Sequence, residues 1–319
     1  MATIPFINNT NLSWTTSAPT FPPLQLAAIV TLSVYSVISV TANAFCLVII
    51  YVTPALQSVN NILLANMATS DLISGAVALP ASIAVVSFIH EVPVALCQFQ
   101  GFALVYLYGV SLMTATAVTI DRFIAVVKPF HYSAITTPKL KWFIALIWLL
   151  PLPMATMPLM KLDHIGFGNF VKVMVCWIDL HQDQLPYTFS ITLLVFIIGT
   201  IIAIISCYTW IFIIACRKTT SAFHGSSKDM KRSIRTTAII IGTSILCWIP
   251  LIVYFIIDLS RGIGSLELSV VEVVIYLAAI SNSMINPIVY ISTNHILRKR
   301  FFHLFKFFPC KSNRIHNLI

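Results

Sequence analysis

The sequence predicts an all-α membrane protein, a seven-transmembrane helix bundle with a short amphipathic eighth helix at the cytosolic face. Three observations support this prediction. Apolar residues make up 58% of the chain, charged residues only 9%, and mean hydropathy is +0.92. The apolar residues form seven blocks, each long enough to cross a hydrocarbon layer about 30 Å thick, which takes roughly 20 helical residues. Basic residues gather in particular connections between the blocks.

The elements follow one another without a sign of a second domain. A polar N-terminal tail occupies residues 1–23, and the bundle occupies residues 24–292. In residues 293–308, apolar side chains recur at helical spacing among basic ones, which is typical of a helix lying in the membrane interface. Residues 309–319 form a cytosolic C-terminal tail. The spans are expected at residues 24–52, 60–88, 97–127, 140–160, 186–215, 234–258 and 268–292.

The distribution of charge predicts the orientation. Sixteen of the 19 lysines and arginines lie near the third and fifth connections and after the last span. Because Lys and Arg near span ends favour the cytoplasm, we expect a multi-pass protein of the plasma membrane with an extracellular N-terminus. The loop from Thr53 to Asn60 carries no basic residue, so the later loops decide the orientation. Asn8 and Asn11 begin sequons in the N-terminal tail and are candidate glycosylation sites.

The net charge of +9 does not require a nucleic acid partner. Basic residues concentrated at one face suit the anionic headgroups of membrane lipids, and an acidic cytosolic partner is the alternative.

The cysteines are sorted by their positions. Cys97 opens the third span on the outer side, and Cys176 lies in the outer loop between the fourth and fifth spans. Both face an oxidising compartment, so we expect a Cys97–Cys176 disulfide, with two free thiols as the alternative. Cys310 follows the amphipathic segment and is a candidate for palmitoylation; an unmodified thiol is the alternative.

Four polar signatures interrupt the apolar spans. They are Asp71 in the second, Asp121-Arg122-Phe123 at the end of the third, Cys247-Trp248-Ile249-Pro250 in the sixth, and Asn286-Pro287-Ile288-Val289-Tyr290 in the seventh. Charge is costly in lipid, so such residues indicate function. In this order the set resembles the rhodopsin-like (class A) G-protein-coupled receptors. The resemblance implies a receptor that binds an extracellular ligand and activates a heterotrimeric G protein.

Asp71 lies in the middle of a span and must be protonated or partnered there. The facing spans offer polar partners at Asn43, Ser111, Asn282, Ser283 and Asn286. Oxygen ligands around one carboxylate suit a small hard cation, and the resemblance implies an allosteric sodium ion. A water-filled polar network is the alternative. No other cofactor or metal is expected.

Arg122 lies where the third span reaches the cytoplasm, and a charged residue with two alternative partners forms a switch. In the receptors that this chain resembles, the adjacent acid holds the arginine at rest and releases it to the G protein. Phe130 resembles the side chain that such receptors insert into the G protein, with a loop residue folded onto the bundle as the alternative.

Pro250 and Pro287 are expected to bend their helices. Trp248 would then sense what fills the pocket. Tyr290 resembles the tyrosine that in such receptors turns inward, towards Tyr208, on activation.

Four positions depart from the family pattern. Thr200 stands in place of a proline in the fifth span, Leu112 in place of an isoleucine, and Ser244 in place of a phenylalanine. Met230 occupies the position of a glutamate that restrains the arginine. We therefore hypothesise a weakened resting lock with appreciable basal signalling, with Asp229 as a weak substitute.

The pocket favours a neutral or lipid-like small molecule because its walls are mostly apolar. Leu104 replaces the Asp that binds amines, and Ile280 replaces the lysine that binds retinal. Rim acids Asp258 and Glu272 leave a basic peptide as the alternative. A transporter is the alternative function, but no inverted repeat is visible, and nothing suggests an enzyme. Besides Trp248, the expected pocket residues are Leu104, Tyr108, Thr192, Phe196, Leu251, Ile252, Phe255 and Tyr276.

Overall fold

The computed structural model describes most of the bundle. The described residues are 22–88, 91–128, 132, 137–160, 170–172, 175–178, 188–218, 227–261 and 270–306. Asn8, Asn11, Phe130 and Cys310 lie outside them, so these predicted modification and contact sites stay predictions. The side chains of Phe255, Asp258, Asp229 and Met230 also lie outside the described set.

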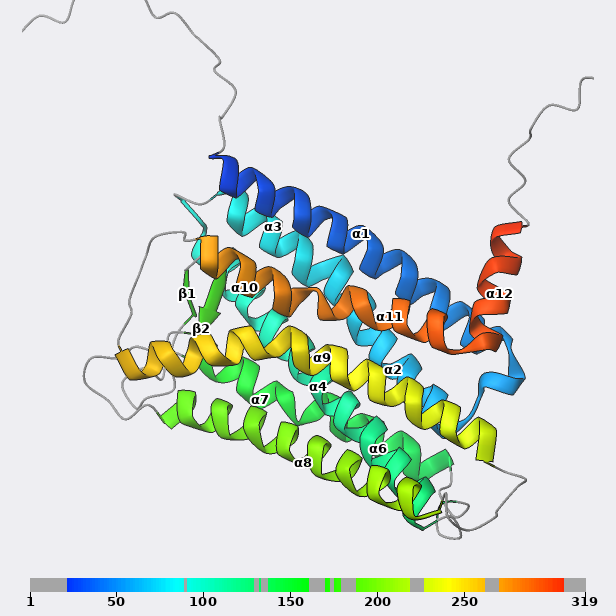
Figure 1. Ribbon diagram of the computed structural model, residues 1–319. Coiled ribbons are helices and arrows are strands. Elements are labelled where there is room, and N and C mark those ends of the chain that lie inside the picture. Colours follow the sequence, from blue (N-terminus) through cyan, green and yellow to red (C-terminus); the bar gives the residue numbers. More distant parts are fainter. Residues whose placement is uncertain are drawn as a thin grey trace, which may run out of the picture.

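The described helices confirm the predicted bundle (Figure 1). Six spans are long and apolar enough to cross a membrane, and a pair of helices bent by 41° forms a seventh. The single-helix spans are α1 (Pro23–Val52), α4 (Val94–Val127), α8 (Thr188–Lys218) and α9 (Ser227–Arg261). The broken spans are α2 (Val59–Ile73) with α3 (Leu79–Ser87), α6 (Thr137–Leu149) with α7 (Pro151–Thr156), and α10 (Val270–Ile280) with α11 (Asn282–Thr293).

Shorter elements complete the fold. The amphipathic helix predicted after the last span is α12 (His295–Lys306). An antiparallel pair, β1 (Phe170–Lys172) and β2 (Cys176–Ile178), was not predicted; it lies at the opposite end of the bundle from α12 (Figure 1). Two 3-10 turns, η1 (Pro54–Leu56) and η3 (Met157–Met160), end the first and fourth spans. We call the end with the strands the disulfide end and the end with α12 and Arg122 the arginine end.

The second span contains a π-helical turn, η2 (Ser74–Ala78), just before Pro80. Proline has no amide hydrogen to donate, and local π turns accommodate such a break. The turn brings Gly75 against α1, where the Ser36 hydroxyl donates to the Gly75 carbonyl at 2.7 Å. A Cβ at Gly75 would lie 2.9 Å from Ser39 Cβ, so glycine permits the close approach of the two helices.

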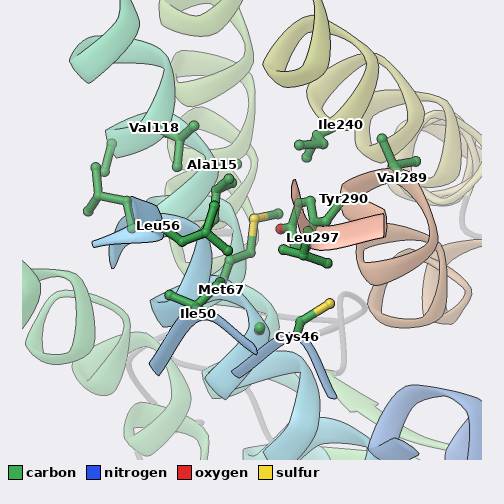
Figure 2. Close-up of a cluster of buried hydrophobic side chains, with 14 of the residues drawn as sticks. Cys46, Ile50, Leu56, Met67, Ala115, Val118, Ile240, Val289, Tyr290 and Leu297 are labelled. Carbon is green, nitrogen blue, oxygen red and sulfur yellow. The ribbon is translucent and has the colours of Figure 1, made fainter. Parts of the chain in front are cut away.

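A cluster of buried apolar side chains joins most helices at the arginine end (Figure 2). It unites Met67 of α2, Ala115 of α4, Ile240 of α9, Tyr290 of α11 and Leu297 of α12. This cluster fixes α12 across the end of the bundle. By contrast, α8 leaves many apolar side chains exposed, as a lipid-facing helix does.

Candidate functional site

Asp71 lies at the centre of a buried polar cluster. Asp71 is 1% exposed, and both of its carboxylate oxygens accept hydrogen bonds. Asn286 Nδ2 donates to Oδ2 at 2.8 Å, and the Ser111 hydroxyl donates to Oδ1 at 3.4 Å. The structure therefore brings together α2, α4 and α11 at this carboxylate.

Asn43 enters the same cluster from α1. Its amide Nδ2 donates to the carbonyls of Ser39, at 2.8 Å, and Ser283, at 3.1 Å. The Ser39 hydroxyl in turn donates to the Asp71 main-chain carbonyl at 2.9 Å. Asn43 thus ties α1 to α11, and Ser39, which the sequence did not single out, ties α1 to α2.

The oxygen atoms of the cluster fit a small hard cation. Asn43 Oδ1 and Asn282 Oδ1 are buried without a hydrogen-bond partner among the described residues. Buried acceptors of this kind need a donor, a water or an ion, and hard cations take carboxylate, hydroxyl and amide oxygens. Asp71 and Ser111 therefore supply oxygen atoms of the right chemistry, and Asn282, next to Ser283 on α11, carries a further unpartnered oxygen.

Ser244 extends this cluster to α9. Its hydroxyl donates to Asn286 Oδ1 at 3.4 Å, and Asn286 donates onward to Asp71. A phenylalanine at this position would have no hydroxyl to offer. The residue that departs from the family pattern thus connects α9 to the buried carboxylate through Asn286.

The side chains that hold Arg122 at the arginine end include Asp121 and Tyr132. Arg122 forms a salt bridge with Asp121, in which Arg122 Nε donates to Oδ2 at 2.9 Å. Arg122 Nη2 also donates to the Tyr132 hydroxyl at 3.1 Å. The Arg122 and Asp121 side chains are 12% and 4% exposed, so the ion pair is largely shielded from solvent. Phe123 follows them on the same helix, half-buried.

Tyr132 is a partner that the sequence reasoning missed. Burial, followed by the negative charge of Asp121, raises the pKa of Tyr132 to about 12. Its hydroxyl therefore stays protonated at physiological pH and accepts from the arginine. The side chain lies in the connection after α4, where no periodic pattern marks a contact.

The two tyrosines expected to meet on activation come from different helices. Tyr208 lies on α8 and Tyr290 on α11, and the Tyr290 residue is 2% exposed. No hydrogen bond joins their hydroxyls in the described structure.

The two prolines of the motifs lie within helices. Pro250 lies inside α9 and Pro287 inside α11, and the break between α10 and α11 is at Ser281.

A cavity opens among α4, α8 and α9 beside Trp248. The space among its lining side chains, counted together with the solvent that it opens onto, is about 890 Å³. The Trp248 ring meets Tyr108 edge to face, with centroids 5.1 Å apart. Five of the predicted pocket residues line this cavity: Tyr108, Phe196, Trp248, Leu251 and Ile252.

Three other predicted pocket residues do not line this cavity in the described part of the chain. Leu104 and Tyr276 are buried in an apolar cluster that joins α1, α3, α4 and α10, and Thr192 is exposed on α8. Their contact with a ligand stays a prediction.

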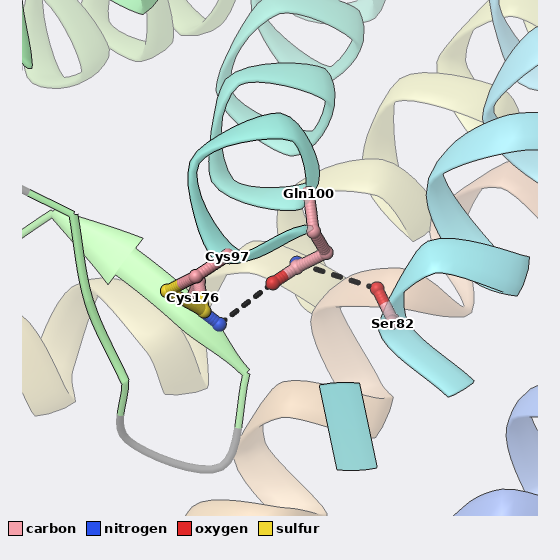
Figure 3. Close-up of a disulfide and its surroundings, with 4 residues drawn as sticks. All are labelled: Ser82, Cys97, Gln100 and Cys176. Carbon is pink, nitrogen blue, oxygen red and sulfur yellow. Dashed lines mark hydrogen bonds between the residues drawn. A yellow bond between two sulfur atoms is a disulfide. The ribbon is translucent and has the colours of Figure 1, made fainter. Parts of the chain in front are cut away.

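The predicted disulfide is confirmed, and it anchors β2 to the start of α4 (Figure 3). Beside it, the fully buried Gln100 accepts a hydrogen bond from the Cys176 amide at 2.6 Å and donates to the Ser82 hydroxyl at 3.3 Å. Gln100 therefore fastens the strand to both α4 and α3. A single polar residue in an apolar span gave no indication of a partner 76 residues away.

Comparison with known proteins identifies the architecture. The model of a family described as 7 transmembrane receptor (rhodopsin family) matches residues 42–290, well over half of the chain. The chain belongs to this family. It is therefore a multi-pass membrane receptor of the G-protein-coupled class, and the transporter alternative is not favoured.

Several named receptors are similar in sequence to this rhodopsin-family receptor over most of its length. The chain is 26% identical over 291 residues to the substance-K receptor of Canis lupus familiaris, covering 85% of this chain and 73% of the relative. It is 25% identical over 312 residues to adenosine receptor A2b of Gallus gallus, covering 88% of each. It is 25% identical over 307 residues to the histamine H2 receptor of Canis lupus familiaris, covering 92% and 83%. These names point to three different ligands.

Proposed function

We propose that this receptor binds an extracellular ligand and activates heterotrimeric G proteins at the arginine end, which faces the cytosol. The observation that carries the proposal is the position of Arg122. It is held by Asp121 and Tyr132 at the end of the bundle where the basic residues concentrate. The cavity beside Trp248 reaches Trp177 of β2 towards the opposite end, which by the same charge argument faces outward from the plasma membrane.

The ligand that the cavity favours is neutral and apolar. No Lys, Arg, Asp, Glu or His lines the cavity within the described residues. A charged ligand would lose its hydration there without gaining a partner. Glu272, predicted to lie at the rim, already accepts a hydrogen bond from the Tyr254 hydroxyl at 2.9 Å, which makes it less available to a basic peptide.

We infer that the Asp71 cluster holds a sodium ion in the resting receptor. Asp71, Ser111 and Asn282 would supply oxygen ligands, while Asn43, Ser283 and Asn286 would position them. The ion would neutralise a carboxylate that has no cationic side chain beside it in the described structure.

Activation would pass through α9. A ligand beside Trp248 changes the packing of the helix that carries Pro250, and α9 is also tied to the Asp71 cluster through Ser244. Movement of α9 would break the Ser244 bond and let Arg122 leave Asp121 for the G protein. A methionine at position 230 offers no carboxylate to pair with Arg122, and the restraints on this arginine include Asp121 and Tyr132, so we expect appreciable basal signalling.

The proposal is tested by expressing the full chain and an Arg122→Leu variant at matched surface levels. A chemically diverse ligand panel, including neutral lipids, is screened with readouts for each major G-protein class. At least one class should respond to the full chain and not to the variant. A response that Arg122→Leu retains in full would overturn the assignment of this residue.

A further inference from the structure

The cavity beside Trp248 continues well past this residue towards the arginine end. Its upper wall includes Val105 and Trp177, and its lower wall includes Ala115 and Ile241. On α4 the lining extends from Val105 to Ala115, and on α8 from Leu193 to Ile204. At about 1.5 Å of rise per helical residue, the lining spans roughly 16 Å along the bundle.

The lower part of the cavity lies against the core and is lined mostly by apolar groups, with Ser111, Ser244 and Asn282 as its polar residues. Its floor is Met67 and Ala115, which belong to the apolar cluster in Figure 2. Ser244 presents a short side chain to this part, and its hydroxyl is engaged by Asn286. The walls therefore provide length and apolar contact without charge.

The sides of this lower part come from helices that are packed on different neighbours. In the described structure α8 packs mainly on α4, whereas α9 packs mainly on α10 and α11. Between α8 and α9 the cavity takes its lining from Ile201 on one helix and Ile245 on the other. The lining of this space is elongated along the helices, which is also the general direction of the chains of membrane lipids.

We propose that this lower cavity is a binding site for the alkyl chain of a single-chain neutral lipid, with the chain passing Trp248 and ending against Ala115 and Ile241. With carbon–carbon bonds of about 1.5 Å, the roughly 16 Å path holds on the order of ten methylene groups. Each buried methylene strengthens binding about fourfold. The assignment names the ligand class of the proposed receptor function and rests on it.

Occupancy can be measured without any signalling. The full chain is purified, reconstituted in phosphatidylcholine nanodiscs, and titrated with saturated monoacylglycerols from hexanoyl to stearoyl. Affinity, referred to the free aqueous concentration of the probe, should rise about fourfold per methylene and then level off once the chain reaches the floor, whereas partitioning into empty nanodiscs continues to rise with chain length. Affinity that follows only the partitioning of each probe into empty nanodiscs would overturn the proposal. If affinity levels off with chain length but the receptor activates no G protein, the proposed function would be contradicted and the lipid-binding site would be supported.

Plugging variants locate the chain. Ile201→Trp fills the lower cavity, and Ile202→Trp is its matched control because Ile202 is 58% exposed on the lipid side of the same helix. Ser244→Phe fills the cavity from α9, and Ser244→Ala removes the hydroxyl without filling it. Each plugging variant should lower the acyl-chain length at which affinity levels off, without changing the affinity for the hexanoyl probe. Both controls should level off at the same chain length as the unsubstituted receptor. Unchanged length dependence in both plugs would overturn the site.

Photolabelling provides a direct location. A monoacylglycerol with a diazirine at the end of its chain should label peptides containing residues 112–115, 201–204 or 241–244. Labels confined to Trp177 and Leu193, above Trp248, would overturn the proposal. Equal labelling of the lower cavity by a diazirine phosphatidylcholine would overturn the assignment to a single-chain ligand.

Discussion

Replacing Tyr132 by Phe tests how the resting receptor holds Arg122. The substitution removes one hydroxyl, and with it the 3.1 Å hydrogen bond from Arg122 Nη2, while the ring that lies 6.0 Å from the guanidinium carbon is kept. Hydrogen bonds to charged groups contribute about 1.5–3 kcal/mol. Because Tyr132 is only half-buried, we discount this to about 1 kcal/mol.

A loss of about 1 kcal/mol from the resting state alone shifts the equilibrium towards the active state about fivefold. Basal second-messenger output should rise by up to that factor at matched surface expression. Tyr51→Phe is the control, because it makes the same chemical change at a tyrosine that is 82% exposed. An unchanged or lower basal output in Tyr132→Phe, with Tyr51→Phe at wild-type level, would show that this bond does not restrain the resting receptor.

Three further predictions concern the polar contacts inside the bundle. Gln100→Met leaves the buried Cys176 amide without its acceptor and should lower the free energy of unfolding by about 1–3 kcal/mol, which lowers the melting temperature of the purified receptor by a few degrees. Equal melting curves would show that Gln100 does not stabilise the attachment of β2. Asp71→Asn should abolish any stabilisation by NaCl over matched choline chloride, and persistence of the sodium effect would place the ion elsewhere. Ser244→Ala removes the bond from α9 to Asn286 and should raise basal signalling a few-fold, whereas a drop would mean that the bond supports the active state.

Much of the fold followed from hydropathy and spacing because lipid constrains sequence strongly. Apolar blocks predicted all seven spans, and the periodic apolar face after the last span predicted α12. The π turn before Pro80 was not predicted, because its geometry depends on how closely Gly75 approaches α1. The β pair consists of three-residue strands, too short to leave a pattern of alternation.

The sequence predicted those residues of the candidate site that belong to charged motifs. It did not predict the contacts made by loop residues or by single polar residues within apolar spans. Asp71, Ser111 and Asn286 meet through hydrogen bonds, as their depth in the membrane suggested. Tyr132 and Gln100 gave no signal, since each acts through a partner that only the fold brings near. The sequence predicts a pocket bordered by Trp248, and the cavity extends from there towards the arginine end, past the short side chain of Ser244.

Nucleotide exchange by purified components tests the central claim most directly. The full chain and Arg122→Leu are reconstituted separately in nanodiscs and mixed with one purified heterotrimeric G protein of each major class. With a ligand from the screen, or without one if basal activity is high, the full chain should accelerate GDP release from at least one class, and Arg122→Leu should not. GDP release that matches empty nanodiscs for every class, or that the two proteins accelerate equally, would contradict the account.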